Sequence, residues 1–183
     1  MPRLWRFSEL IDTDVLAPGF YMKSPLPELA SHCLEAIRPD FASTAGQGDI
    51  MLSGPNMGVG SSREQAAEVL KYLGVEAIIA PSFADIFFNN SCKNGLLPIV
   101  LDSMKVDQLF LEVEANPGYE LEVDLEACLV TTPAGNELSF DFDDGLRFRL
   151  LNGLDDIGIT LQNEPDIRDY EDRRMKECPW LFS

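Results

Sequence analysis

The chain of 183 residues has the size of one ordinary domain, and 45% of its residues are hydrophobic, enough for a substantial core. Its formal net charge of −17 makes nucleic acid and anionic membranes poor partners. The charge is uneven, because residues 1–100 carry 7 basic and 11 acidic side chains whereas residues 101–183 carry 7 and 20. We therefore expect an anionic ligand to bind in the first half.

The cysteines argue against a metal site in this chain. The four of them (Cys33, Cys92, Cys128 and Cys178) lie far apart, without the close pairs typical of zinc or iron–sulfur ligation. His32 is the single histidine, so a histidine-rich site is excluded as well. Scattered cysteines, a short polar start and no apolar run of membrane-spanning length predict a cytoplasmic protein with reduced thiols.

The first elements are a strand and a helix. We expect residues 12–24 to form a strand followed by a loop, in which Asp12 and Asp14 shape turns, since no third carboxylate lies nearby to bind a metal with them. Pro27 suits the first turn of a helix. The apolar residues of that helix fall on one face, so His32 is expected to be exposed; they are Leu29, Ala30, Cys33, Leu34 and Ile37.

The middle of the chain alternates strands and helices. Apolar strands are predicted over residues 50–52, 75–80 and 97–101, with helices ending at Leu73 and spanning residues 82–93. Gly74 and Gly95 stop the two helices. This order predicts a parallel sheet with right-handed crossovers.

The second half predicts an antiparallel part. A helix is expected over residues 103–115, followed by two alternating segments, 121–125 and 138–142, that form a hairpin with one wet face. Helical turns over 148–151, a strand over 157–161 and a charged helix from Pro165 complete the chain. The predicted fold class is α/β, with three layers, a parallel βαβαβ sheet and an antiparallel sheet, in a single domain over residues 1–183.

The glycine-rich stretch from Gly54 to Gln65 connects a strand to a helix. Unpaired N–H groups at a helix start and the planar fork of Arg63 suit an anion, and glycines such as Gly60 let a ligand approach the backbone. Two overlapping capping boxes begin at Ser61 and Ser62. If Ser62 caps the helix, the Ser61 hydroxyl has no structural role and is a candidate nucleophile or base. A plain capped helix fits the spacing equally well, and the stretch matches neither the Walker loop nor the dinucleotide fingerprint.

Several ordered motifs span almost the whole chain: residues 12–14 (DTD), 58–64 (GVGSSRE), 80–87 (APSFADIF), 94–98 (NGLLP) and 151–158 (LNGLDDIG). Together they resemble the small, or swivel, subunit of 3-isopropylmalate dehydratases in the aconitase superfamily. One departure is Gln65, where relatives usually carry histidine.

The resemblance implies a swivelling β/β/α fold and half of an enzyme. The large subunit of such a heterodimer binds a four-iron four-sulfur (4Fe-4S) cluster through three cysteines, whereas this chain binds no cofactor. Ser61 would be the general base of a hydro-lyase that isomerises 2- and 3-isopropylmalate in leucine biosynthesis. Ser62, Arg63 and Gly60 would bind a dicarboxylate substrate.

The family's substrate loop corresponds to residues 21–24, with Tyr21 and Lys23 as candidate substrate contacts. An apolar residue in place of Lys23 goes with an isopropyl group, and an arginine goes with the extra carboxylate of homoaconitate. Lysine fits a carboxylate partner, a stem lying against an isopropyl group, or a solvated side chain. 3-Isopropylmalate is the first choice, and a homoaconitase or another alkylmalate hydro-lyase is the alternative. A dicarboxylate-binding regulatory module is the alternative without chemistry.

Overall fold

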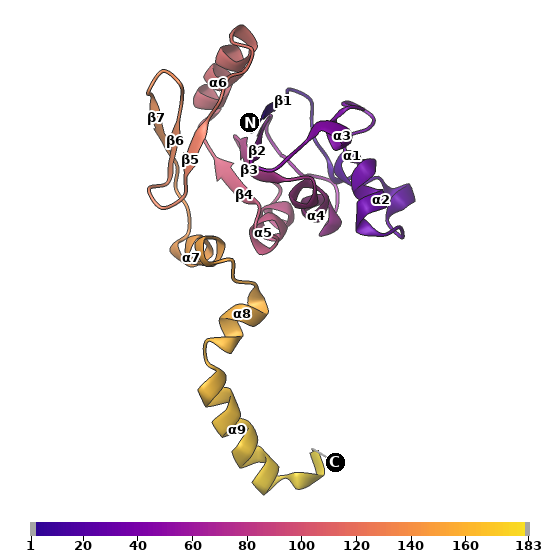
Figure 1. The fold of residues 1–183 in the computed structure, drawn as a ribbon, viewed down its shortest axis with the longest axis vertical. Coiled ribbons are helices and arrows are strands. Elements are labelled where there is room, and N and C mark those ends of the chain that lie inside the picture. The colour runs from indigo at the N-terminus through magenta and orange to yellow at the C-terminus, as the bar shows by residue number, and fades with distance from the viewer. Residues whose placement is uncertain (1–2, 182–183) are drawn as a thin grey trace.

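A computed structural model describes residues 3–181 and contains two sheets (Figure 1). The first is parallel, with the strands in chain order: β1 (Leu4–Phe7), β2 (Asp49–Ser53), β3 (Val75–Ala80) and β4 (Leu97–Val100). In its register Trp5 pairs with Met51 and Met51 with Ile78. The second is antiparallel and contains β5 (Glu122–Asp124), β6 (Leu129–Thr131) and β7 (Glu137–Ser139).

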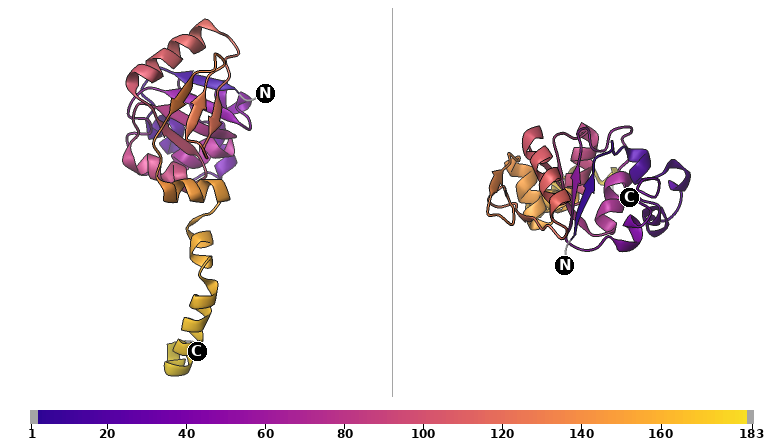
Figure 2. Two further views of the ribbon diagram at one scale, coloured as in Figure 1. Left: turned by 90° about the vertical axis from the view of Figure 1, so that its left-hand side faces the viewer. Right: turned by 90° about the horizontal axis from the view of Figure 1, so that it is seen from above.

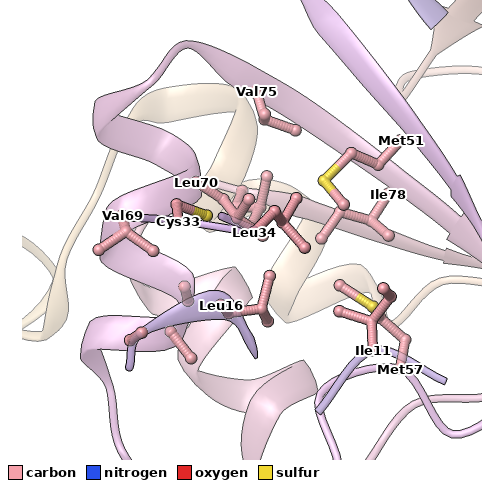
Figure 3. Packing of buried hydrophobic residues seen from close by; sticks show 14 of the residues in the cluster. Ile11, Leu16, Cys33, Leu34, Met51, Met57, Val69, Leu70, Val75 and Ile78 are labelled. Atoms are coloured by element: carbon pink, nitrogen blue, oxygen red, sulfur yellow. The ribbon is translucent and has the colours of Figure 1, made fainter. Parts of the chain in front are cut away.

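Helices cover one face of the parallel sheet. They are α1 (Thr13–Leu16), α2 (Leu26–Ser31), α3 (Phe41–Thr44), α4 (Gln65–Tyr72) and α5 (Asp85–Lys93), with a 3-10 turn, η1 (Gly19–Tyr21). A buried cluster lies between them and the sheet, where Leu16 and Leu70 pack near Met51 and Ile78 (Figure 3). Alternate residues of a strand point to opposite faces of the sheet, so each strand can contribute side chains to a buried cluster on either face.

The other face of the parallel sheet packs against the antiparallel sheet. Leu52, Ile79 and Ile99 form a second buried cluster with Val130 of β6 and with α6 (Ser103–Ala115). Helices, parallel sheet and antiparallel sheet thus form three layers, which confirms the predicted fold class (Figure 2).

The N-terminal segment differs from the prediction. Residues 4–7 form strand β1, whereas residues 12–24 contain no strand, because the Asp12 carboxylate accepts a hydrogen bond from the Val15 N–H (2.8 Å) and starts α1. Helix α2 ends at Ser31, and Leu34 has a left-handed φ of 61°. His32 is less exposed than expected: its side chain is 26% exposed, because it stacks on Tyr21.

The C-terminal segment also differs. Strand β6 was not predicted, and it turns the expected hairpin into three strands. The strand predicted over 157–161 is wrong, because Asp155 accepts a hydrogen bond from the Gly158 N–H (2.6 Å) and caps helix α8 (Asp156–Leu161). Helices α7 (Asp144–Asn152) and α9 (Glu164–Glu177) confirm the helical turns and the charged helix.

The last segments form an extended arm, which we define as residues 156–181. Helices α8 and α9 and the 3-10 turn η2 (Pro179–Leu181) project away from the two sheets (Figures 1 and 2). Ile157, Tyr170 and Trp180 are exposed along it. Among the helices of residues 3–181, none is long and apolar enough to cross a membrane.

Candidate active site

The loops that follow β1, β2 and β3 meet at the carboxyl edge of the parallel sheet, where ligands bind in such folds. Two short bridges connect them, one between Asp12 and Val59 and the other between Met57 and Phe83. The Thr13 N–H donates to the Val59 carbonyl (2.8 Å), and the Met57 N–H donates to the Ser82 carbonyl (3.0 Å). The glycine-rich loop is therefore fixed from both sides.

Two glycines let this loop pack closely. Gly58 has a φ of 76°, and a Cβ placed there would lie 2.1 Å from the ring of the buried Phe87. Gly60 has a φ of 120°, and its Cβ would lie 3.1 Å from the Thr13 hydroxyl. Both positions thus require glycine for structural reasons. A ligand contact at Gly60 stays a prediction.

The Ser61 hydroxyl lies among hydrogen-bond donors. Its Oγ accepts from the Arg63 side-chain Nε–H (2.8 Å) and, at a longer 3.4 Å, from the Arg63 backbone N–H. The Thr13 hydroxyl lies 3.1 Å away. Ser61 therefore does have structural partners, contrary to the expectation from the capping boxes, yet the residue is exposed.

Arg63 is held by α1 and the residue after it. Its Nη1 donates to Asp14 Oδ1 (2.6 Å) and to the Ala17 carbonyl (2.8 Å), and its side chain is only 19% exposed. Within residues 3–181, its Nη2 has no hydrogen-bond partner in the structure. Two of the guanidinium nitrogens thus fix the side chain, and a ligand contact of the third stays a prediction.

The sequence analysis does not predict the contacts of Thr13 and Asp14 with the Ser61 loop. It treated Asp14 as a turn former, although the matched motif at residues 12–14 already contained both side chains. A strand over residues 4–7 places this motif in a loop at the same sheet edge as the Ser61 loop. Without β1 in the prediction, their meeting was not visible.

Neither Ser61 nor Ser62 caps helix α4, so the two capping boxes that the sequence offers are not formed. Helix α4 begins at Gln65, its cap residue is Glu64, and no side chain caps it. Ser61 and Arg63 form hydrogen bonds with residues of α1, and helix α4 starts only after them in the chain. Ser62 is exposed, and its carbonyl accepts a hydrogen bond from Asn90 (3.4 Å).

Tyr21 and Lys23 lie in the segment that follows Ala17, whose carbonyl accepts a hydrogen bond from Arg63. The ring of Tyr21 stacks on His32, with centroids 3.5 Å apart, and His32 Nδ1 lies 2.6 Å from Glu35. Lys23 is exposed and has no hydrogen bond or ion pair to the rest of residues 3–181. Neither side chain hydrogen-bonds to Ser61 or Arg63, so their substrate contacts stay predictions.

The described part of the chain, residues 3–181, contains no group of three His, Cys, Asp or Glu side chains arranged to hold a metal ion. All four cysteines are free, and burial raises the pKa of the Cys33 thiol and raises that of Cys92 to about 12.

A cavity of about 740 Å³ lies at the amino end of β1, beside Arg3 and Trp5, away from Ser61.

Family models match most of the chain. The aconitase C-terminal domain matches residues 37–104, and LeuD_N matches residues 107–144. The C-terminal domain of the small chain of 3-isopropylmalate dehydratase matches residues 156–183.

Individual proteins agree with the family models. The 3-isopropylmalate dehydratase small subunit of Marinobacter nauticus is 55% identical over 150 residues, 80% of this chain and 70% of that protein. The one from Neisseria lactamica is 54% identical over 134 residues, 73% of this chain and 98% of that protein. The crystal structure of 3-isopropylmalate dehydratase (leuD) from Methanocaldococcus jannaschii superposes with a TM-score of 0.74 at 31% identity, covering 93% of this chain and 97% of that one. The chain therefore belongs to the family of 3-isopropylmalate dehydratase small subunits.

Proposed function

We propose that this chain is the small subunit of a hydro-lyase that interconverts 2-isopropylmalate and 3-isopropylmalate by dehydration and rehydration, a step of leucine biosynthesis. Family membership supports the reaction, and the surroundings of Ser61 support the role of this chain in it. The observation that carries the proposal is the Ser61 Oγ held 2.8 Å from the Arg63 guanidinium at the carboxyl edge of the sheet.

In this proposal Ser61 removes a proton from a substrate carbon and later returns one. A serine alkoxide is costly in water, but a guanidinium and N–H donors around the oxygen favour its negative form. As the C–H bond breaks, its proton goes to Ser61 and its electrons form the double bond of the unsaturated intermediate. The hydroxyl group leaves as water, with a second proton that an acid of the large subunit would supply. Rehydration reverses these steps, with the hydroxyl group on the neighbouring carbon.

The proposed carboxylate site consists of Arg63 and Ser62. The Nη2 of Arg63 faces no protein acceptor within residues 3–181, and the exposed Ser62 precedes it in the chain. Asp14 neutralises part of the guanidinium charge, but its contact with Nη1 also fixes the direction of Nη2. A carboxylate bound there would place the neighbouring carbon near Ser61.

The active site needs a second chain, because both serines are exposed on an open edge. The segments after β1, β2 and β3 carry exposed apolar residues: Leu10, Phe20 (90% exposed), Val59 and Ile86. We propose that they contact the large subunit of a two-subunit dehydratase. That subunit would carry the 4Fe-4S cluster, which supplies Lewis-acid chemistry at the substrate hydroxyl, and the free thiols here fit a cytoplasmic complex.

The test is to co-express both subunits, reconstitute the complex anaerobically and measure isomerisation of 2-isopropylmalate and 3-isopropylmalate. Ser61→Ala should lower kcat by roughly 10²- to 10⁴-fold with little change in KM, the range for losing a positioned proton-transfer group. Ser62→Ala, one residue away, should act mainly on KM. The small subunit alone should bind no iron and show no turnover. Near-normal kcat in Ser61→Ala would refute its role as the base.

Substrate choice is proposed to depend on Lys23. In the complex, Lys23→Leu should preserve or improve kcat/KM for 3-isopropylmalate and lower any activity on homoaconitate by about 5- to 150-fold, because a buried carboxylate would lose its partner. Unchanged kcat/KM ratios would mean that Lys23 does not contact the substrate. A complex that binds these dicarboxylates without turnover would support the regulatory alternative instead.

A further inference from the structure

The hydroxyl of Thr13 is buried against Ser61. Thr13 is the first residue of α1 and is only 1% exposed, and its backbone N–H is already bonded to the Val59 carbonyl. Its Oγ1 lies 3.1 Å from Ser61 Oγ, which is its one hydrogen-bond partner within residues 3–181. Three contacts therefore bring the start of α1 to the Ser61 loop: this one, the Val59 bond, and the ion pair of Asp14 with Arg63.

The direction of this hydrogen bond follows from burial. Among residues 3–181, Thr13 has no other acceptor in reach for its proton, and a buried donor left unpaired is costly. Ser61 is exposed, so its own proton can point to solvent or to a bound substrate. Thr13 therefore donates and Ser61 accepts.

We propose that Thr13 is a positioning residue for the reaction, which directs the Ser61 proton outward and stabilises the oxygen after that proton has left. The inference rests on the proposed role of Ser61 as the base. With Thr13 and Arg63 Nε both donating, the lone pairs of Ser61 Oγ that face the protein are occupied. The remaining direction is toward the open edge, where the substrate carbon would lie.

The same arrangement provides a donor for the alkoxide. When Ser61 loses its proton to solvent water at the open edge, the Thr13 hydroxyl keeps donating to an oxygen that is now charged, and such hydrogen bonds are stronger than neutral ones. The proton of Thr13 stays on Thr13, so no additional group is required. Because this bond strengthens as charge develops, it acts on kcat more than on substrate binding.

A matched pair of variants in the reconstituted complex tests the inference. Thr13→Val has nearly the same shape without the hydroxyl, whereas Thr13→Ser keeps the hydroxyl. With 3-isopropylmalate as the substrate, Thr13→Val should lower kcat by about 10- to 150-fold, the range for losing one hydrogen bond to a charged group, with KM within about 2-fold. Thr13→Ser should stay within about 3-fold of the parent.

A double-mutant cycle separates this inference from the proposed function. If Thr13 acts through Ser61, then Thr13→Val should change kcat by less than about 2-fold in the Ser61→Ala background. Additive losses would overturn the inference, as would a Thr13→Val kcat within about 3-fold of the parent while Ser61→Ala loses activity. Retained turnover in Ser61→Ala would instead refute the proposed base.

A folding control completes the design. Thermal unfolding of each small subunit and co-purification with the large subunit show whether a variant folds. Should Thr13→Val not fold, Thr13→Ala replaces it as the variant without a hydroxyl. If both fail to fold while Thr13→Ser folds, the hydroxyl has a structural role and the inference is overturned.

Discussion

Replacing Gly58 with alanine tests how closely the Ser61 loop packs on the sheet. The added Cβ would lie 2.1 to 2.6 Å from atoms of Phe87, a side chain that is 1% exposed and has little room to move. Its φ of 76° adds a backbone cost of about 1–2 kcal/mol for a residue other than glycine. Overpacking a core costs typically about 1–3 kcal/mol, so the expected loss of unfolding free energy is about 2–5 kcal/mol.

Gly135 provides the matched control. It has a similar φ of 81°, but nothing lies within 4 Å of its Cβ position. Gly135→Ala should therefore show the backbone cost alone, about 1–2 kcal/mol, or a fall in Tm of about 2–8 °C. Gly58→Ala should lower Tm by about 4–20 °C, as measured by calorimetry or denaturant unfolding.

The reasoning would be refuted if the two alanine variants were destabilised equally. A second check uses Phe87→Ala, which removes the ring that the new Cβ would meet. The double variant should be more stable than the sum of the single losses predicts, by about the overpacking term of roughly 1–3 kcal/mol.

Other expectations concern stability. Ser62→Ala should change the unfolding free energy by less than about 0.5 kcal/mol, since no cap is lost; a loss of about 1 kcal/mol would restore the capping role. Asp49→Ala should cost about 2–4 kcal/mol in denaturant unfolding, because the buried carboxylate accepts from Trp5 Nε1 (2.6 Å) and from two backbone N–H groups. Burial and a hydrogen bond to Glu112 raise the pKa of Tyr119 to about 12. The folded-state pKa of Tyr119 exceeds the unfolded value near 10, so its contribution to the unfolding free energy is present below about pH 10 and lost between about pH 10 and 12. In denaturant unfolding over this pH range, Tyr119→Phe should weaken the fall of the unfolding free energy with pH.

The sequence predicted the helices and strands whose apolar pattern and end signals lie within a short stretch of the chain. Strands β2, β3 and β4 are mainly apolar runs, as buried parallel strands usually are, and Gly74 and Gly95 separate β3 and β4 from the preceding helices. The positions of Ser61 and Arg63 in the loop between β2 and α4 followed directly. That the whole chain is one domain stays a prediction.

The elements and contacts that the sequence did not predict correctly have physical reasons. The side chains of residues 4–7 are alternately half-buried and buried, a pattern too short to identify a strand from sequence. Pairing with β2 is what makes these residues a strand. The segment 157–161 has β-branched residues but leaves the two sheets, so it has no strand to pair with among residues 3–181, and the Asp155 cap decides for a helix. The bond of Thr13 to Ser61 joins residues 48 positions apart, beyond any local pattern.

The arm of residues 156–181 has a consequence for how the chain melts. Helix α9 is 14 residues long, close to the length below which isolated helices are marginal in water, and one of its supports is the exposed pair Glu164 and Arg168. Pairs of this kind add only about 0.2–0.5 kcal/mol and weaken with salt. The arm should therefore lose its helix gradually with heat or salt, as a coil transition without a sharp midpoint, while the two sheets still unfold together in one cooperative step.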